Sequence, residues 1–188
     1  MKEFIESEFR NISCNFINLQ ALSPQIEKVS DICIEALKNG HKIMFCGNGG
    51  SAADSQHLAA ELVGRYKINR PAMNALALTV DTSILTAVGN DYGYDTIFER
   101  QVEGIGKSGD VLIGLSTSGN SKNVLAAFEL AKKMGILTVA MTGHSGGKMK
   151  ELADYAINVP SDVTNNIQEM HIAVGHLLCG VIEKELNA

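Results

Sequence analysis

The sequence has no tryptophan, few prolines and no long apolar stretch, and it carries no excess of basic charge. Its net charge is −5 over 188 residues, which argues against binding nucleic acid by neutralising phosphates. Apolar runs such as KIMFC and ILTVAM are only a few residues long, whereas a membrane-spanning helix needs about 20 residues. The charged N-terminus, MKEFIESEFRN, lacks the apolar core of a signal peptide. We therefore expect a cytoplasmic protein with no nucleic-acid partner and no membrane partner.

Cysteine is also scarce, and no two cysteines have the spacing of a zinc knuckle or a redox motif. The four residues are Cys14, Cys33, Cys46 and Cys179, and none belongs to a CxxC pair. Three of them fall on expected apolar faces, so we interpret them as buried free thiols in a reducing compartment. A hydrophobic content of 45% in 188 residues fits one globular domain with a well-filled core.

From residue 42 onward, short apolar runs alternate with segments of helical periodicity. The runs predict strands at 42–46, 75–78, 111–115, 137–141 and 156–159. The periodic segments predict helices at 52–65, 82–90, 121–134, 147–153 and 163–187. Continuous apolar strands that alternate with helices indicate a parallel sheet covered on both faces, and right-handed crossovers make it a doubly wound α/β sandwich. Ligands bind such folds at the carboxyl ends of the strands, near a topological switch point.

Two further helices are expected before the first strand. Apolar residues recur at helical spacing over residues 1–20. The second helix has Ser23 as its expected N-cap, Pro24 at its first position and Gly40 at its end. Residues 1–40 therefore predict a helical arm that packs on the sheet domain.

The run CGNGGSAADSQHLAAELVGRY starts with a glycine-rich loop directly after the first expected strand. Glycines allow positive φ angles and let a ligand approach the backbone N–H groups, and Ser51 is placed to cap the helix that follows. The pattern is not a Walker loop, because no Lys-Ser or Lys-Thr follows, and it is not the dinucleotide motif GxGxxG. The loop therefore predicts either an anion site or a plain tight turn.

A second polar loop follows the strand at 111–115. It places four hydroxyl groups at the start of the next helix, those of Ser116, Thr117, Ser118 and Ser121. Hydroxyl and backbone N–H donors at a helix N-terminus suit a phosphate group. The alternative interpretation is a serine-rich turn with Ser121 as an ordinary N-cap, which needs only one hydroxyl.

Behind the first loop, His57, Glu61 and Arg65 are spaced four residues apart, which places them on one face of the expected helix. Gln168 and His176 lie eight residues apart on the last helix and can border one face. Nitrogen and oxygen ligands from two helices suit a zinc-type ion, although an i, i+4 His–Glu pair also occurs as a hydrogen-bonded surface pair. We interpret the remaining histidines as surface or packing residues, namely His41, His144 and His171.

Several long motifs occur in order along nearly the whole chain. They are GNGGSAADSQHLAAELVGRY, VGNDYGYDTIFERQVE, GDVLIGLSTSGNSKNV, TGHSGGKMKELADYAINVP and IQEMHIAVGHLLCGVIEKEL. In these motifs the chain resembles the sugar isomerase (SIS) domain family, and more narrowly its isomerases of heptose 7-phosphates. The resemblance implies a single SIS domain over residues 1–188, with a five-stranded parallel sheet between helical layers. It also implies a homotetramer with active sites at the subunit interfaces.

The activity implied by the resemblance is the aldose–ketose isomerisation of D-sedoheptulose 7-phosphate to D-glycero-D-manno-heptose 7-phosphate, which supplies heptose for lipopolysaccharide or capsule. The implied acid–base pair is Glu61 and His176. The implied cofactor is one zinc ion per subunit, bound by His57, Glu61, Gln168 and His176. The substrate-binding positions of the family correspond here to Asn48, Gly49, Gly50, Ser51, Glu61, Arg65, Asn90, Asp91, Ser116, Thr117, Ser118, Ser121 and Gln168.

The chain departs from the family pattern at Asn165, three residues before Gln168, where members commonly carry an acidic residue that contacts the sugar. The preceding segment, residues 160–164, is also shorter than the family pattern. An asparagine side chain can donate and accept hydrogen bonds, but it cannot act as a base. The departure therefore concerns recognition of the sugar hydroxyls more than the class of reaction.

An isomerisation of this kind moves a proton between the first two carbons and another between their oxygens. A carboxylate suits the transfer at carbon, and a histidine suits the transfer at oxygen. A residue that ligates a metal cannot use the same lone pair as a base, so Glu61 uses its second oxygen, or ligation loosens during turnover, or zinc marks a resting form.

Two other functions are open at this point. One is a non-catalytic SIS binding module, either a sugar-phosphate sensor or a protein associated with a replication initiator, and such a module would be expected to lose the acid–base pair. The other is a metal hydrolase, for which no nucleophile-activating arrangement is evident.

Overall fold

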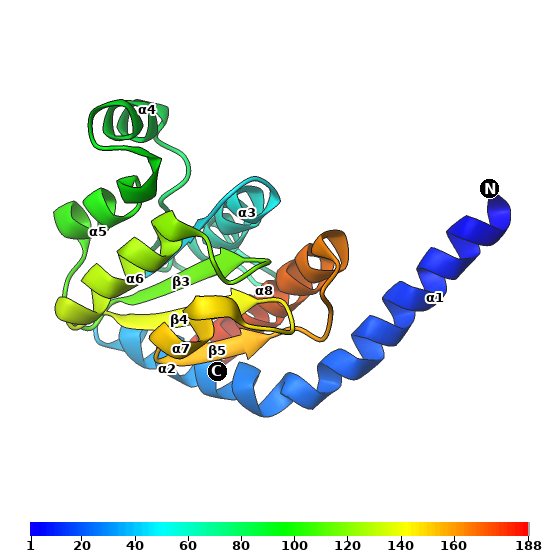
Figure 1. Cartoon of the computed structure of the whole chain (residues 1–188). Coiled ribbons are helices and arrows are strands. Elements are labelled where there is room, and N and C mark those ends of the chain that lie inside the picture. The colour runs from blue at the N-terminus through cyan, green and yellow to red at the C-terminus, as the bar shows by residue number, and fades with distance from the viewer. Residues whose placement is uncertain (188) are drawn as a thin grey trace.

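A computed structural model describes residues 1–187, and over this range the strands form one five-stranded parallel sheet in the order β2-β1-β3-β4-β5 (Figure 1). Neighbouring strands pair in parallel throughout. The strands are β1 (Ile43–Gly47), β2 (Ala75–Ala77), β3 (Val111–Ser116), β4 (Leu137–Thr142) and β5 (Tyr155–Asn158). Their bounds agree with the expected strands to within one residue at each end, so the expected parallel sheet is confirmed.

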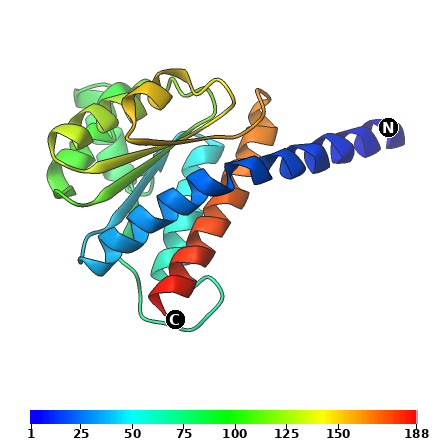
Figure 2. The same cartoon turned by 90° about the horizontal axis from the view of Figure 1, so that it is seen from below.

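Alternate residues of each strand point into separate cores on the two faces of the sheet. In β1, Ile43 and Phe45 belong to one buried cluster, whereas Met44 and Cys46 belong to the other. The first core is covered by α2 (Ser23–Lys38), α3 (Gly50–Val63) and α8 (Thr164–Leu186), and the second by α5 (Glu99–Ile105), α6 (Lys122–Lys133) and α7 (Gly147–Leu152) (Figures 1 and 2). Because both faces are covered, the strands are apolar at almost every position. The expected three-layer α/β sandwich is therefore confirmed.

The order of the strands places the topological switch point between β1 and β3. The chain leaves β1 for β2 on one side, and it then returns to form β3 on the other side of β1. The loops that follow β1 and β3 consequently start from neighbouring strand ends, where open α/β sheets bind their ligands.

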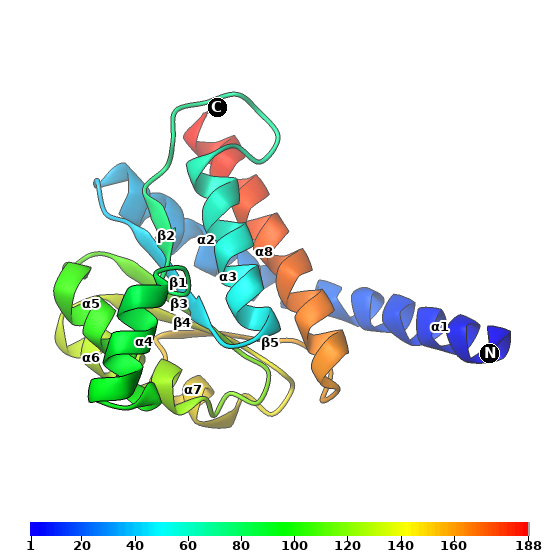
Figure 3. The same ribbon diagram turned by 90° about the horizontal axis from the view of Figure 1, so that it is seen from above.

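The N-terminal arm divides into a packed part and a projecting part. A 3₁₀ turn at Gln20–Leu22 joins α1 (Lys2–Leu19) to α2 almost without a break, and α1 extends away from the body of the molecule (Figures 1 and 3). Phe4, Phe9 and Ile17 are each more than 60% exposed on α1. The expected N-cap at Ser23 is wrong, because Ser23 itself has helical backbone angles and its hydroxyl donates to the carbonyl of Gln20 at 2.7 Å.

The segment between β2 and β3 contains one helix that was expected and one that was not. The expected helix is α4 (Thr82–Asp91), which stands outside the sheet layers (Figure 1). The sequence pattern missed α5, which is short and buries the polar Gln101 where an apolar residue would mark the face. The side-chain amide of Gln101 donates to the carbonyls of Leu78 and Ile97, which satisfies it inside the core.

The cysteines lie as the sequence indicated. Three thiols are buried, and burial raises the pKa of Cys33 and Cys46 to about 12, while Cys14 is exposed on α1. Among the helices that the structure describes, none combines the length and hydropathy needed to cross a membrane.

Candidate active site

The loop after β1 enters α3 through a glycine in the left-handed region. Gly49 has φ 57° and occupies the N-cap position, and the helix starts at Gly50. The expectation that Ser51 caps the helix is wrong, because Ser51 lies inside the first turn, makes no capping bond and is only 3% exposed. The turn leaves the first N–H groups of α3 without capping side chains, as an anion site requires.

The loop after β3 gathers its hydroxyls at the N-terminus of α6. Ser121 is at the N-cap position, as in the alternative interpretation, but its hydroxyl bonds the hydroxyl of Ser116 at 2.8 Å instead of a backbone N–H. The hydroxyl of Ser118 accepts from the N–H of Asn120 at 3.2 Å, and Ser118 is exposed while Thr117 is half-buried. The arrangement differs from an ordinary capped turn and leaves the N-terminal end of the α6 dipole open to an anion.

The two loops are joined by a pair of side-chain amides. Asn48 donates to Asn123 at 3.0 Å, and Asn123, which is buried on α6, donates back to Asn48 at 2.8 Å. The hydroxyl of Tyr94 also donates to the side-chain oxygen of Asn48 at 2.9 Å. The structure thus brings the two expected anion loops together. Asn90 and Asp91 lie at the end of α4, where both are exposed and bonded to each other at 2.8 Å.

Helices α3 and α8 run side by side in the same direction (Figure 3). They approach closely because α8 carries Gly175, where an added Cβ would lie 2.4 Å from the side chain of Leu58. Any larger residue at that position would push the helices apart. The close approach of the helices at Gly175 lets neighbouring side chains of α3 and α8 contact each other.

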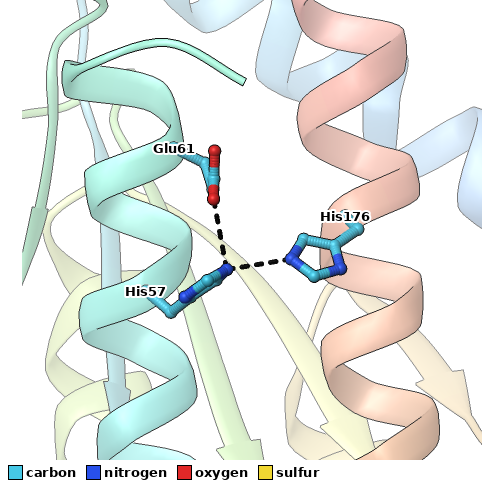
Figure 4. Close-up of side chains that lie close together, drawn as sticks. All are labelled: His57, Glu61 and His176. Atoms are coloured by element: carbon cyan, nitrogen blue, oxygen red, sulfur yellow. Dashed lines mark hydrogen bonds and ion pairs between the residues drawn. The ribbon is translucent and has the colours of Figure 1, made fainter. Parts of the chain in front are cut away.

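His57, Glu61 and His176 meet across this helix pair (Figure 4). The Nε2 atom of His57 lies 2.9 Å from Nε2 of His176 and 3.2 Å from a carboxylate oxygen of Glu61. One ring nitrogen or carboxylate oxygen from each of the three residues lies within 4.8 Å of those of the other two. Two imidazole nitrogens and a carboxylate oxygen converging in this way fit the ligands of a zinc-type ion. The His57–Glu61 pair is therefore more than a surface pair on one helix.

Two other expected site residues lie away from this cluster. The side-chain amide of Gln168 packs against Gly50, at the opposite end of α3 from Glu61. The expectation that Arg65 shares a helical face with His57 and Glu61 is wrong, because α3 ends at Val63 and Arg65 is exposed in the following loop. Asn165 donates its amide to the side chain of Asn166 at 2.8 Å.

Two apolar grooves flank His176. One, of about 640 Å³, runs between α8 and the loop after α3, and the ring of Tyr66 in that loop stacks on the ring of His176 at 5.6 Å. The other, of about 400 Å³, lies between α8 and the junction of α1 with α2. Both grooves are lined by His176 and Leu177, and Leu177 is 53% exposed.

Polar groups that the sequence did not single out are buried around the same helix pair. His171 is fully buried, neither of its ring nitrogens has a hydrogen-bond partner among residues 1–187, and burial lowers its pKa to about 4. One carboxylate oxygen each of Asp54 and Glu169 is also buried without a hydrogen-bond partner within the described range. Arg70 and Glu183 form a buried ion pair at 3.0 Å. For Asp54, Glu169, His171 and Glu183, the signal in the sequence is a polar residue within a helical segment, whereas Arg70 lies in the loop between α3 and β2.

Comparison with known proteins gives one consistent result. A family model described as the SIS domain matches residues 9–143. A phosphoheptose isomerase from Akkermansia muciniphila is 67% identical over 186 residues, which cover 99% of this chain and 98% of the relative. A solved structure of a phosphoheptose isomerase from Francisella tularensis matches with a TM-score of 0.94 and 38% identity over 97% of both chains. One from Neisseria gonorrhoeae matches with a TM-score of 0.92 and 41% identity, over 97% of this chain and 98% of that one.

Proposed function

The chain belongs to the SIS domain family and, within it, to the phosphoheptose isomerases, and we propose that it converts D-sedoheptulose 7-phosphate to D-glycero-D-manno-heptose 7-phosphate. The observation that carries this proposal is that His57 and Glu61, on the helix that starts at the loop after β1, converge with His176 of α8. The product would be a precursor of the nucleotide-activated heptose of lipopolysaccharide or capsule. Residues 1–188 would act as one SIS domain.

The phosphate end of the substrate would bind at the joined loops. Hydroxyl and N–H donors converge there from two helix N-termini, which favours a dianion without a lysine. Gln168 and Asn48 lie against the same loops and would contact the sugar chain. The proposed binding residues are Asn48, Gly49, Gly50, Ser51, Ser116, Thr117, Ser118, Ser121 and Gln168, with Glu61, Arg65, Asn90 and Asp91 nearer the sugar.

The proton transfers would be performed by Glu61 and His176. The carboxylate of Glu61 takes the proton from one carbon and returns it to the neighbouring carbon, while His176 transfers a proton between the carbonyl and hydroxyl oxygens. The side chain of Glu61 is 21% exposed, so a sugar can reach it. Because only one oxygen of Glu61 lies at the His57 nitrogen, the second oxygen remains for proton transfer.

The donor set of the cluster fits a zinc ion held by His57, Glu61 and His176. The fourth ligand expected from the family resemblance, Gln168, packs instead against Gly50 at the other end of α3. When bound, such an ion would supply Lewis acidity beside the negative charge that develops on the sugar oxygens. The histidine and carboxylate side chains would still have to position the substrate and move its protons.

We further propose that the active form is a homotetramer whose sites lie between subunits. Ser51 and Glu61 are separated by ten residues of α3, which corresponds to about 15 Å along the helix axis, so one chain holds the anion loop and the acid–base pair well apart. The apolar grooves at His176 and the exposed aromatic residues of α1 provide surfaces that another subunit can cover.

The test is to incubate the purified protein with D-sedoheptulose 7-phosphate, with and without a chelator, and to detect the aldose product. We expect product formation that the chelator slows and that added zinc restores. Conversion that is insensitive to the chelator would remove zinc from the proposal. Binding of the sugar without any conversion would instead indicate a sugar-phosphate binding module.

A further inference from the structure

Glu183 receives hydrogen bonds from three successive backbone N–H groups of the loop after α3. It lies on α8 seven residues after His176, which places it two turns further along nearly the same face. Its carboxylate accepts from the backbone N–H groups of Tyr66, Lys67 and Ile68 at 2.7–3.0 Å. Glu183 is only 2% exposed, so these bonds take the place of the hydrogen bonds to water that the carboxylate loses on burial. The loop after α3 is therefore fixed to α8 at this residue.

Arg70 extends the same network to the end of α3. Its Nε donates to Glu183 at 3.0 Å, and its two terminal nitrogens donate to the carbonyls of Leu62 and Glu61 at 2.8 and 2.9 Å. These carbonyls belong to the last turn of the helix, where backbone acceptors lack partners within the helix. Arg70 thus joins Glu183 to the turn of α3 that carries the Glu61 side chain.

Tyr66 connects the network to His176. Its backbone N–H is bound by Glu183, and its ring stacks on the imidazole of His176 with an angle of 24° between the ring planes. The imidazole of His176 in turn places its Nε2 atom 2.9 Å from His57. A ring packed against the imidazole restricts its rotation, which keeps that nitrogen directed at the cluster.

We propose that Glu183, acting through Arg70 and Tyr66, is a positioning residue that sets the relative placement of Glu61 and His176. The two groups of the acid–base pair come from different helices, and this network contacts the supporting backbone of one and the ring of the other. The expected effect on catalysis rests on the proposed isomerase function. The expected effect on zinc binding depends only on the His57–Glu61–His176 cluster.

A network that served folding alone would have a different signature. Its loss would lower the melting temperature but would leave zinc affinity and kcat of the folded protein unchanged. Loss of a positioning network misplaces ligands, and residues that support metal ligands typically change metal affinity by about 10- to 100-fold. KM would change little, because the phosphate loops are at the other end of α3.

The experiment compares three variants with Glu185→Gln, which removes a charge from an exposed position of the same helix. The variants are Glu183→Gln, Tyr66→Leu and Tyr66→Phe. The measurements are the zinc dissociation constant by competition with a chromophoric chelator, kcat and KM for D-sedoheptulose 7-phosphate, and the melting temperature.

We expect Glu183→Gln and Tyr66→Leu to weaken zinc binding and to lower kcat by roughly tenfold or more, with KM within about twofold of the unsubstituted protein. Tyr66→Phe, which keeps the stacked ring, should restore both properties. Folded Tyr66→Leu protein with unchanged zinc affinity and kcat would overturn the proposal, even if Glu183→Gln failed to fold. An unsubstituted protein that binds zinc but does not isomerise the sugar would contradict the proposed function, and the zinc constants would still decide the positioning role.

Discussion

The two ends of the α3–α8 helix pair differ in how completely their buried polar groups are paired. At the C-terminal end, the carboxylate of Glu183 accepts four hydrogen bonds, and every nitrogen of the Arg70 guanidinium donates at least one. Towards the N-terminal end, buried polar atoms of Asp54, Glu169 and His171 have no hydrogen-bond partner in the part of the chain that the structure describes. The His57–Glu61–His176 cluster lies between these two regions.

This difference indicates which end is scaffold and which end is built for a ligand. Buried polar groups that are fully paired hold a single arrangement, whereas unpaired ones carry a desolvation cost that a stable fold normally avoids. The unpaired groups lie in the N-terminal halves of α3 and α8. These halves are next to the loop after β1, where Gln168 packs against Gly50. Substitutions at the two ends should therefore affect different measurable quantities.

The largest effect is expected for Glu61→Gln, in the cluster that lies between the two ends of the helix pair. The amide keeps the shape of the side chain but cannot take a proton from carbon, and loss of a general base lowers kcat by about 10²- to 10⁴-fold. Binding of D-sedoheptulose 7-phosphate, measured by calorimetry, should persist because the phosphate loops are intact. Full turnover by this variant would exclude Glu61 from the chemistry.

A smaller effect is expected at the ligand end, for the double substitution Ser116→Ala with Ser118→Ala. Hydrogen bonds to a charged group contribute about 1.5–3 kcal/mol, so KM for the phosphorylated sugar should rise by roughly tenfold or more while kcat changes less. The matched control is Ser108→Ala, an exposed serine that precedes β3 and so lies at the opposite end of that strand from the loop. An unchanged KM in the double variant would move the phosphate site away from the loop.

The smallest effect concerns the dependence of stability on pH, through His171. Its pKa is lowered from 6.5 to about 4 by burial, so the unfolded chain binds a proton more readily than the folded chain. The stability associated with neutral His171 is present above pH 6.5 and is lost as the pH falls towards 4. This linkage should cost about 2 kcal/mol between pH 7 and pH 5.

The measurement is the free energy of unfolding by urea at pH 7 and pH 5, at one protein concentration, for the unsubstituted protein and for His171→Leu. The variant has no titrating group at this position, so its stability should fall less between the two pH values. An equal fall in both proteins would mean that His171 is paired or protonated in the folded state.

The sheet, its layers and the two loops could be predicted from the sequence because they depend on local patterns. Apolar runs of strand length and glycine or hydroxyl-rich turns are encoded within a few residues of one another. The convergence of His57, Glu61 and His176 was expected only through the family resemblance, since spacing alone favoured a hydrogen-bonded surface pair. Its geometry depends on Gly175, whose lack of a side chain lets α8 approach Leu58.

The parts that could not be predicted depend on contacts between distant residues. Arg65 falls outside α3 because the helix ends at Val63, where Arg70 binds the carbonyls of the last turn. Glu183 resembles a solvated charge on a terminal helix, yet its donors lie 113 to 117 residues away in the chain. No local pattern records such a pairing.

The reciprocal amide bonds between Asn48 and Asn123 have a consequence for how a sugar phosphate would be captured. These bonds tie the loops of β1 and β3 together before any ligand arrives, so little ordering of the backbone remains to be done when an anion enters. The conformational entropy of these loops is lost on folding, so ordering them does not weaken ligand binding. Even a small fragment such as inorganic phosphate should thus find a ready-made receptor there, and the rest of the sugar would add selectivity.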